Sequence, residues 1–369
     1  MFKRALLLVL PLFLLAGCWD FEEVDRRAFA TTVGIDRPAA GRVVLSVQIP
    51  IFKTGGGEKR GETTGFYVLT RAARTVHAAF AALQTETARD LVIQQNKTVI
   101  LGEAAARGGV KPLLDYLRRN PKAPPQSLVF IASGKSAAEV LSFCLPKDIL
   151  PADELILAAQ AVPKADRVYF IPLWQFIQKL VHQSKDPYAP LIGVDRREKS
   201  FVLAGTAVFA GDRLAGKLDE EETQAFGLLA NLMRAGTVTF TTSGGAVSLR
   251  NVKGKTRIAV REEKGRPAFI IKTTVYATLS ENTAGRTGLT PADYRRLEGE
   301  AARALRPRLA AVVKKLQNWE ADVIDCGETL RAYHPRLWAR VKSSWRAVYR
   351  QAPVTVEVRV RLARNGSLR

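Results

Sequence analysis

The chain is poor in the side chains that most often build metal centres and nucleophilic active sites. Its 369 residues include three cysteines and three histidines. His77, His182 and His334 are far apart, and neither an H-E-x-x-H nor a C-x-x-C sequence occurs, which excludes the common zinc sites. A G-x-S-x-G nucleophile elbow is also absent, which excludes the usual serine hydrolase arrangement. We therefore predict a protein that is not an enzyme and that uses no metal or other cofactor.

Three local patterns that could suggest chemistry have a simpler structural interpretation. Gly134-Lys135-Ser136 resembles the end of a phosphate-binding loop, but the first glycine of that motif is missing. Asp322 and Asp325 could form a carboxylate pair, although aspartates at a turn or a helix end are the favoured interpretation. Trp338 and Trp345 are seven residues apart on one helical face, so we expect them in a hydrophobic core.

Long apolar runs are also scarce, with one exception near the first residue. The run from Ala5 to Gly17 holds thirteen residues, follows Lys3 and Arg4, and is interrupted by Pro11. It is too short to span a hydrocarbon core, which needs about twenty residues. A basic start, a short apolar run and a small-residue end are the parts of a bacterial secretory signal.

The end of this run fits a lipoprotein processing site. Leu15-Ala16-Gly17-Cys18 matches the lipobox pattern, which predicts cleavage between Gly17 and Cys18 and a diacylglyceryl group on the Cys18 thiol. Two acyl chains anchor a protein stably, whereas one does not. We predict a signal peptide over residues 1–17 and a body tethered to the outer face of the cytoplasmic membrane. The alternatives are an uncleaved signal anchor, or a secreted protein with a chance cysteine.

The two remaining cysteines do not define a disulfide. Cys144 and Cys326 are 182 positions apart, and a disulfide requires their Cα atoms to lie within about 7 Å, which a sequence cannot show. We expect two buried free thiols, and pairing stays open.

Acidic residues are under-represented relative to basic ones. The sequence holds 56 Lys and Arg against 35 Asp and Glu, a net charge of +21. Loss of the signal with Lys3 and Arg4 would leave 54 against 35, a net charge of +19. An exported protein is not expected to bind nucleic acid. Two interpretations stay open: attraction to anionic lipid headgroups or wall polymers, or cations spread over solvated faces.

Residues 18–198 are expected to form an N-terminal α/β region, in one piece or as two subdomains, because short strands alternate with helices. The proline-rich stretch 145–200 ends in a charged run, which predicts a domain boundary there. The glycine-rich segment 55–61 predicts a flexible loop. The expected strands are 29–35, 42–49, 98–101 and 127–132, and the expected helices are 71–87, 110–119 and 137–143.

Residues 199–369 are expected to form a C-terminal α+β domain. Thr290 before Pro291 predicts a helix start, an apolar stripe continues to Trp319, and Pro307 should kink or split this helix. The last strand, 354–362, alternates strictly between apolar and polar residues, Arg359 and Arg361 among the latter, so one face should be buried and the other cationic. The other expected elements are strands at 202–209, 213–218, 236–242, 246–252, 256–261 and 267–279, and a helix at 335–349.

These parts predict a multi-domain α+β protein with mixed or antiparallel sheets and packed helices. The long helix should lie across a C-terminal antiparallel sheet.

Ordered landmarks along nearly the whole chain resemble those of one known family. The chain resembles the Ger(x)C family, the C-subunit lipoproteins of bacterial spore germinant receptors. The landmarks are Gly17-Cys18-Trp19-Asp20, Gly34-Ile35-Asp36, Lys97–Glu103, Gly109, Asp115–Pro121, Gly205–Phe209, Gly216-Lys217-Leu218, Trp319–Asp322, Gly327-Glu328, Trp338, Trp345 and the terminal alternating strand.

The resemblance implies a non-enzymatic receptor subunit. Such a subunit sits at the spore inner membrane with membrane-embedded A and B subunits, and the receptor responds to small nutrients. Which nutrient this is, and whether this subunit contacts it, stays open. An alternative is the solute-binding lipoprotein of a transporter, which would normally show two similar α/β lobes; the β-rich run 202–279 argues against it.

Overall fold

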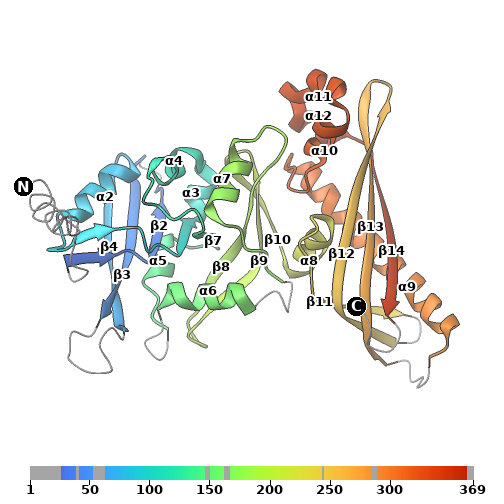
Figure 1. Cartoon of the computed structure of the whole chain (residues 1–369), viewed down its shortest axis with the longest axis horizontal. Coiled ribbons are helices and arrows are strands. Elements are labelled where there is room, and N and C mark those ends of the chain that lie inside the picture. The colour runs from blue at the N-terminus through green and yellow to red at the C-terminus, as the bar shows by residue number, and fades with distance from the viewer. Residues whose placement is uncertain are drawn as a thin grey trace, which may run out of the picture.

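The structure, a computed structural model, describes residues 26–38, 41–52, 63–145, 150–161, 167–242, 245–283 and 289–363. It has two large sheets, which lie side by side along the long axis of the molecule (Figure 1). The predicted signal peptide, Cys18 and the glycine-rich segment 55–61 lie outside the described residues. Within those residues, no helix is both long enough and apolar enough to cross a membrane.

The first sheet has eight strands and a parallel centre. β2, β6, β7 and β8 are parallel neighbours, and antiparallel strands extend the sheet on both sides in the order β10-β9-β8-β7-β6-β2-β3-β4. The strands are β2 (Thr32–Asp36), β3 (Val43–Phe52), β4 (Thr63–Ala73), β6 (Thr98–Gly102), β7 (Leu128–Ala132), β8 (Tyr188–Asp195), β9 (Ser200–Ala210) and β10 (Arg213–Leu218). A separate parallel pair joins β1 (Arg27–Phe29) to β5 (Asp90–Val92).

Helices cover both faces of this sheet. Val99 and Leu101 of β6 belong to one hydrophobic core, while Ile100 of the same strand and Phe130 of β7 belong to another. Strands that are buried on both faces are expected where crossover helices cover a parallel sheet. The first core contains side chains of α2 (Val76–Gln84), α3 (Glu103–Gly108), α4 (Lys111–Arg119) and α7 (Leu173–Val181), and the second contains those of α5 (Ala137–Leu141) and α6 (Pro151–Ala161).

The first sheet extends across the predicted boundary between residues 198 and 199. β9 and β10 follow that boundary, yet β9 pairs with β8 from Tyr188↔Val208 to Asp195↔Ser200. The hairpin predicted at 202–218 therefore completes the N-terminal sheet. Where independently folding units begin and end stays a prediction.

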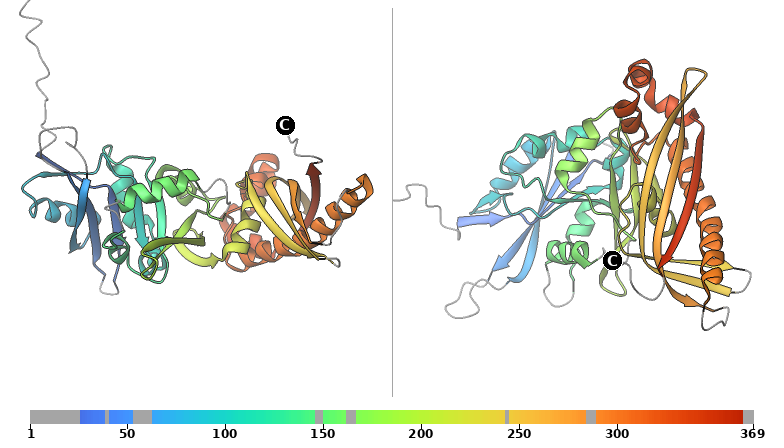
Figure 2. Two further views of the ribbon diagram at one scale, coloured as in Figure 1. Left: turned by 90° about the horizontal axis from the view of Figure 1, so that it is seen from below. Right: turned by 45° about the vertical axis from the view of Figure 1, so that its right-hand side comes forward.

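The second sheet has four strands in the order β11-β12-β13-β14. Its strands are β11 (Gly236–Thr242), β12 (Gly245–Glu263), β13 (Arg266–Asn282) and β14 (Val354–Ala363). The long helix α9 (Pro291–Asn318) lies along one face, and the shorter α8 (Glu220–Leu229) lies beside it (Figures 1 and 2). Leu305, Leu309 and Leu316 of α9 are buried, as its apolar stripe predicts. The predicted α+β class and the long helix across the C-terminal sheet are confirmed.

The helix α9 starts where the sequence predicts, but its internal proline does not break it. The Thr290 side chain accepts a hydrogen bond from the Asp293 amide, and the Asp293 side chain accepts one from the Thr290 amide, which forms a capping box. Pro307 does not split the helix, which runs unbroken past it. Pro307 is exposed, so the carbonyl that loses its donor can bond to water instead.

β14 is the exception to antiparallel pairing in this sheet. It runs parallel to β13 over ten residue pairs, from Phe269↔Val354 to Thr278↔Ala363. The chain between the two strands contains α9, α10 (Cys326–Tyr333), α11 (Pro335–Val341), the 3-10 turn η4 (Lys342–Ser344) and α12 (Trp345–Gln351). The alternation of β14 predicted its buried face correctly, but a pattern of period two carries no information on strand direction.

Several predicted elements differ from the observed ones. The helix predicted from residue 71 begins at Val76, because residues 71–73 pair with β3 as the end of β4. The strands predicted at 246–252 and 256–261 are one strand, β12, with a bulge between Arg250 and Lys253. The helix predicted at 335–349 is divided into α11, η4 and α12. The helices α3, α6, α7, α8 and α10 were not predicted.

The two described cysteines are free thiols, but only one is buried. Cys326 is fully buried and Cys144 is exposed. The expectation of two buried thiols is therefore wrong for Cys144. This residue lies at the surface, shortly after the end of the short helix α5.

Candidate functional site: the junction of the two sheets

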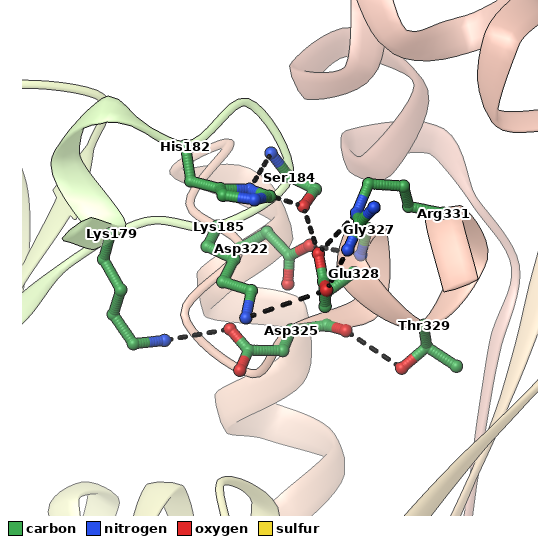
Figure 3. A network of polar contacts seen from close by, with 10 residues as sticks. All are labelled: Lys179, His182, Ser184, Lys185, Asp322, Asp325, Gly327, Glu328, Thr329 and Arg331. Carbon is green, nitrogen blue, oxygen red and sulfur yellow. Dashed lines mark hydrogen bonds and ion pairs between the residues drawn. The ribbon is translucent and has the colours of Figure 1, made fainter. Parts of the chain in front are cut away.

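The two sheets are joined by a polar junction built from two connecting segments. One runs from α7 to β8 (residues 179–188), and the other runs from the end of α9 into α10 (residues 319–331). Figure 3 shows side chains of both segments pointing toward each other. We call the contacts between these two segments and α12 the junction.

An ion pair between a buried carboxylate and a partly exposed arginine lies at the centre of the junction. Asp186 is 2% exposed, and the Arg346 guanidinium of α12 binds both of its carboxylate oxygens at 2.6 and 2.9 Å. The backbone amides of Gly211 and Asp322 donate to the same carboxylate at 2.7 and 2.8 Å. A two-point guanidinium contact with further amide donors meets the hydrogen-bonding needs of a desolvated carboxylate.

Asp322 holds the start of α10. Its carboxylate is 1% exposed and accepts hydrogen bonds from the amides of Cys326 at 2.9 Å and Gly327 at 2.6 Å. The pKa of Asp322 is raised to about 7, chiefly by burial; the amides of Gly327 and Cys326 oppose the shift, and the nearby charges of Asp325 and Asp186 add to it. The group therefore changes its charge near neutral pH while it caps a helix at the junction.

A second ion pair links α7 to the residue that precedes α10. The Lys179 ammonium is almost fully buried and donates to Asp325 at 2.9 Å. Asp325 has a φ of +66°, in the left-handed region. Lys179 also lies 6.0 Å from the centre of the Tyr188 ring, so its charge is held between a carboxylate and an aromatic face.

Ser184, His182 and Glu328 lie together without forming a catalytic triad. The Ser184 hydroxyl lies 2.9 Å from His182 Nδ1 and donates to Glu328 at 2.8 Å, so the serine sits between the base and the acid. In a triad the histidine must lie between the other two groups. Ser184 is also fully buried. The Arg331 side chain beside it and the hydrogen bond from Ser184 lower the pKa of Glu328 to about 2.

Two glycines allow the aromatic side chains of the junction to pack closely. A β-carbon on Gly327 would lie 2.7 Å from the Trp345 indole, and one on Gly216 of β10 would lie 2.2 Å from the Trp319 ring. Both distances are far shorter than real contacts of this kind. Trp345 packs edge-on against Trp338, with 5.5 Å between ring centres, and lies 5.7 Å from the Tyr349 ring.

A small cavity of about 250 Å³ borders the junction. Residues of α7, β8, β12 and the segment before α10 line it, among them Lys179, Tyr188, Thr256 and Asp325. The Lys179–Asp325 pair forms part of its wall, so the cavity is lined by one positively and one negatively charged side chain.

A larger hollow of about 700 Å³ lies at the carboxyl ends of the parallel strands β2, β6 and β7. Asp36, which ends β2, accepts hydrogen bonds from the amides of Ala137 and Ala138 at 2.8 and 3.0 Å. Glu103, just after β6, accepts from the Lys217 ammonium at 2.6 Å and from the Gly134 amide at 2.6 Å. Burial raises the pKa of Asp36. The pKa of Glu103 is lowered to about 2: burial opposes this shift, and its hydrogen bonds, first that from Lys217, outweigh it.

The structure supports a structural role, and not a chemical one, for the three local patterns noted in the sequence. Asp322 and Asp325 are aspartates at the start of a helix, and Trp338 and Trp345 lie in the core. Gly134-Lys135-Ser136 forms the turn into α5, where Ser136 caps the helix. Among the described residues, no three His, Cys, Asp or Glu side chains gather in a group that could hold a metal ion.

Sequence reasoning missed the partners that form the junction. Asp186 and Arg346 are 160 positions apart, and Lys179 and Asp325 are 146 apart. Nothing in the local sequence marks these pairs.

Known proteins resemble this chain over both halves. Residues 20–194 match a family described as the spore germination protein N-terminal domain, and residues 204–366 match one described as spore germination B3/GerAC like, C-terminal. The protein YfkR of Bacillus subtilis (strain 168) is 26% identical, with 98% of this chain and 96% of YfkR covered. Spore germination protein B3 of the same organism is 23% identical, with 97% and 96% covered.

A solved structure shares the fold. The crystal structure of the GerBC protein superposes with a TM-score of 0.60 at 19% identity, and it covers 94% of this chain and 100% of the GerBC chain. The fold and the two sequence matches define a spore germination protein. The chain belongs to the Ger(x)C family, the C subunits of spore germinant receptors.

Several family landmarks in the sequence meet in space at the two places described above. Asp36 and Glu103 lie at the strand-end hollow, where Lys217 reaches Glu103. Asp322 and Gly327 lie at the junction. Several of the family landmarks therefore take part in contacts between segments that are far apart in the sequence.

Proposed function

We propose that this chain is the lipid-anchored C subunit of a germinant receptor and acts with membrane-embedded A and B subunits in nutrient-triggered spore germination. The observation that carries the proposal is the full-length similarity, since both halves of the chain match spore germination families. The lipobox at Leu15–Cys18 supports a diacylglyceryl anchor on Cys18 at the outer face of the spore inner membrane.

A role in assembly or signalling, without catalysis, agrees with the chemistry of the described residues. The one serine–histidine–carboxylate group at the junction is buried and has the wrong order for nucleophilic catalysis. The solute-binding alternative is less well supported, because the eight-stranded and four-stranded sheets are not two similar lobes.

A clean deletion in the parent spore former tests the proposal. Loss of this subunit should abolish germination by the nutrients of its own receptor and leave germination by other nutrients intact. An enzyme that degrades the spore cortex would instead be needed for every route. Normal germination with every nutrient in the deletion strain, with no paralogue present to substitute, contradicts the proposal.

Complementation tests the anchor separately. A copy with Cys18→Ala should remain an unprocessed or mislocalised precursor and should restore germination poorly, because two acyl chains are lost. Membrane fractionation under high salt measures the anchor directly. If the variant stays in the membrane fraction as firmly as the parent, contacts other than the lipid hold the protein there. Co-purification with tagged A and B subunits tests the assembly.

A further inference from the structure

The middle of one face of the second sheet carries eight basic side chains and one acidic one. This face lies opposite the buried face that packs against α8 and α9 (Figures 1 and 2). We call the charged side chains in the middle of this face, on β12, β13 and β14, the cationic face. They are Arg250, Lys253, Lys255, Arg257, Arg261, Lys272, Arg359, Arg361 and the acidic Glu357, and all nine are exposed. Toward the two ends of the sheet the same face also carries Arg266, Glu263 and Glu281.

The strand register places these charges in adjacent rows. Lys253 pairs across Tyr276 with Arg361, and the next row runs from Lys255 through Thr274 to Arg359. Neighbouring strands lie about 4.8 Å apart, and side chains on one face repeat about every 7 Å along a strand. The rows therefore form a dense array of positive charge across three strands.

Few of these positive charges are compensated by acidic side chains of the fold itself. Arg257 lies directly opposite Lys272, and like charges in that position destabilise a sheet. Lys272 has Glu357 at 3.5 Å and Arg361 has Glu298 at 4.0 Å. The other six basic side chains have no ion-pair partner among the residues that the structure describes. The repulsion would be relieved by negative charge supplied from outside the chain.

The shape and chemistry of the face indicate what supplies that charge. The two hollows described above are lined by other residues, and neither opens onto this face. The face therefore offers an extended array of cations and not a pocket for a small ligand. The centres of protein–protein interfaces are depleted of charged residues, whereas charge is densest here in the middle rows. Tyr276, 38% exposed, stands among the cations, and tyrosine favours the headgroup level of membranes. We infer that the cationic face docks on the anionic headgroups of a lipid bilayer.

This inference does not depend on the lipid anchor. Cations held near an anionic surface each add to the attraction, and salt screens that attraction. The face would add a second point of attachment and would set which side of the C-terminal half meets the membrane.

Vesicle binding tests the inference with the anchor removed. The protein is the chain from residue 18 onward with Cys18→Ser, which keeps every described residue. Phosphatidylcholine vesicles with and without phosphatidylglycerol are the probes, and co-sedimentation measures the bound fraction. We expect binding to the anionic vesicles only, and its loss in about 1 M salt, where the Debye length falls to about 3 Å.

Charge reversal locates the surface that binds. The triple variant Lys253→Glu, Lys255→Glu and Arg257→Glu should bind anionic vesicles at least about tenfold more weakly. A control with the same change in net charge reverses three exposed cations of α9 that have no ion-pair partner among the described residues. The control substitutions are Arg303→Glu, Arg306→Glu and Lys314→Glu. Thermal unfolding confirms that both variants are folded.

The outcomes separate the inference from its rivals. A large loss in the sheet variant with a small loss in the α9 variant supports it. Equal losses mean that net charge alone drives binding, and they overturn it. Equal binding of the parent chain to neutral and anionic vesicles also overturns it, as does an absence of binding to both, which would leave an acidic protein or polymer as the partner of this face.

Discussion

Protonation of Asp322 should make the stability of this protein fall as the pH rises toward neutrality. Its pKa is 3.8 in an ordinary setting and about 7 in the fold. Between these values the folded chain holds a proton that the unfolded chain has released. At about 1.4 kcal/mol per pH unit, the free energy of unfolding should fall by about 4 kcal/mol between about pH 4 and pH 7, and then level off.

Other shifted carboxyl groups do not reverse this trend. Glu103 and Glu328 have pKa values of about 2 in the fold. They stabilise the folded chain at neutral pH and lose that contribution only below their ordinary value of about 4.5. Asp36, whose pKa is raised by burial, acts in the same direction as Asp322. The slope above pH 5 therefore reports on buried carboxyl groups with raised pKa values.

The variant Asp322→Asn isolates the contribution of this residue. An asparagine keeps one oxygen acceptor for the amides of Cys326 and Gly327 and leaves the other unmatched, which should cost about 1–3 kcal/mol at pH 5. At pH 8 the parent chain carries the cost of a buried charge and the variant does not, so the difference should shrink or change sign. Urea unfolding followed by tryptophan fluorescence at several pH values measures both.

The control is Asp115→Asn, a change at an exposed carboxylate that pairs with two arginines. Its lowered pKa affects stability only at acidic pH, so it should keep the parent slope between pH 5 and 7. If Asp322→Asn also keeps that slope, or if the parent chain shows none, Asp322 is ionised throughout and the reasoning fails.

Three further substitutions test the packing of the junction and the C-terminal sheet. Arg346→Met should cost about 1–3 kcal/mol of unfolding free energy, because the buried Asp186 loses its partly exposed cation but keeps two amide donors, and adding Asp186→Asn should restore part of the loss in urea unfolding. Leu309→Asp should cost several kcal/mol, while Leu309→Met should cost less than about 1.5, and equal melting temperatures would place the side chain in solvent. Gly327→Ala should cost about 1–3 kcal/mol and alter the near-ultraviolet circular dichroism of Trp345; an unchanged spectrum would contradict the close packing.

Local sequence patterns predicted the elements whose signals are local. The cap at Thr290, the apolar stripe of α9 and the alternation of β14 correspond to observed elements. Prolines misled the prediction for residues 145–200. Pro151 begins α6 and Pro172 caps α7, positions where proline favours a helix start.

Of the elements that were not predicted, some carry a local sequence signal and others depend only on long-range contacts. The start of α8 does carry a local signal, the capping box of Asp219 and Glu222. By contrast, residues 71–73 could be assigned to β4 only from their pairing with β3. The junction likewise depends on long-range contacts, because its ion pairs join residues more than a hundred positions apart. Contacts of that range depend on the assembled fold and leave no periodic trace in the sequence.

The parallel pairing of β13 with β14 has a consequence for how the chain matures. Phe269 and Val354 are paired neighbours separated by 85 positions, and pairings of such long range form slowly. Until β14 is made and docked, β13 presents an open hydrogen-bonding edge, and strand edges of this kind promote aggregation. A chain that stops before residue 354 would lack this last strand altogether. Such a truncated chain should therefore keep this edge exposed and aggregate more readily than the complete chain.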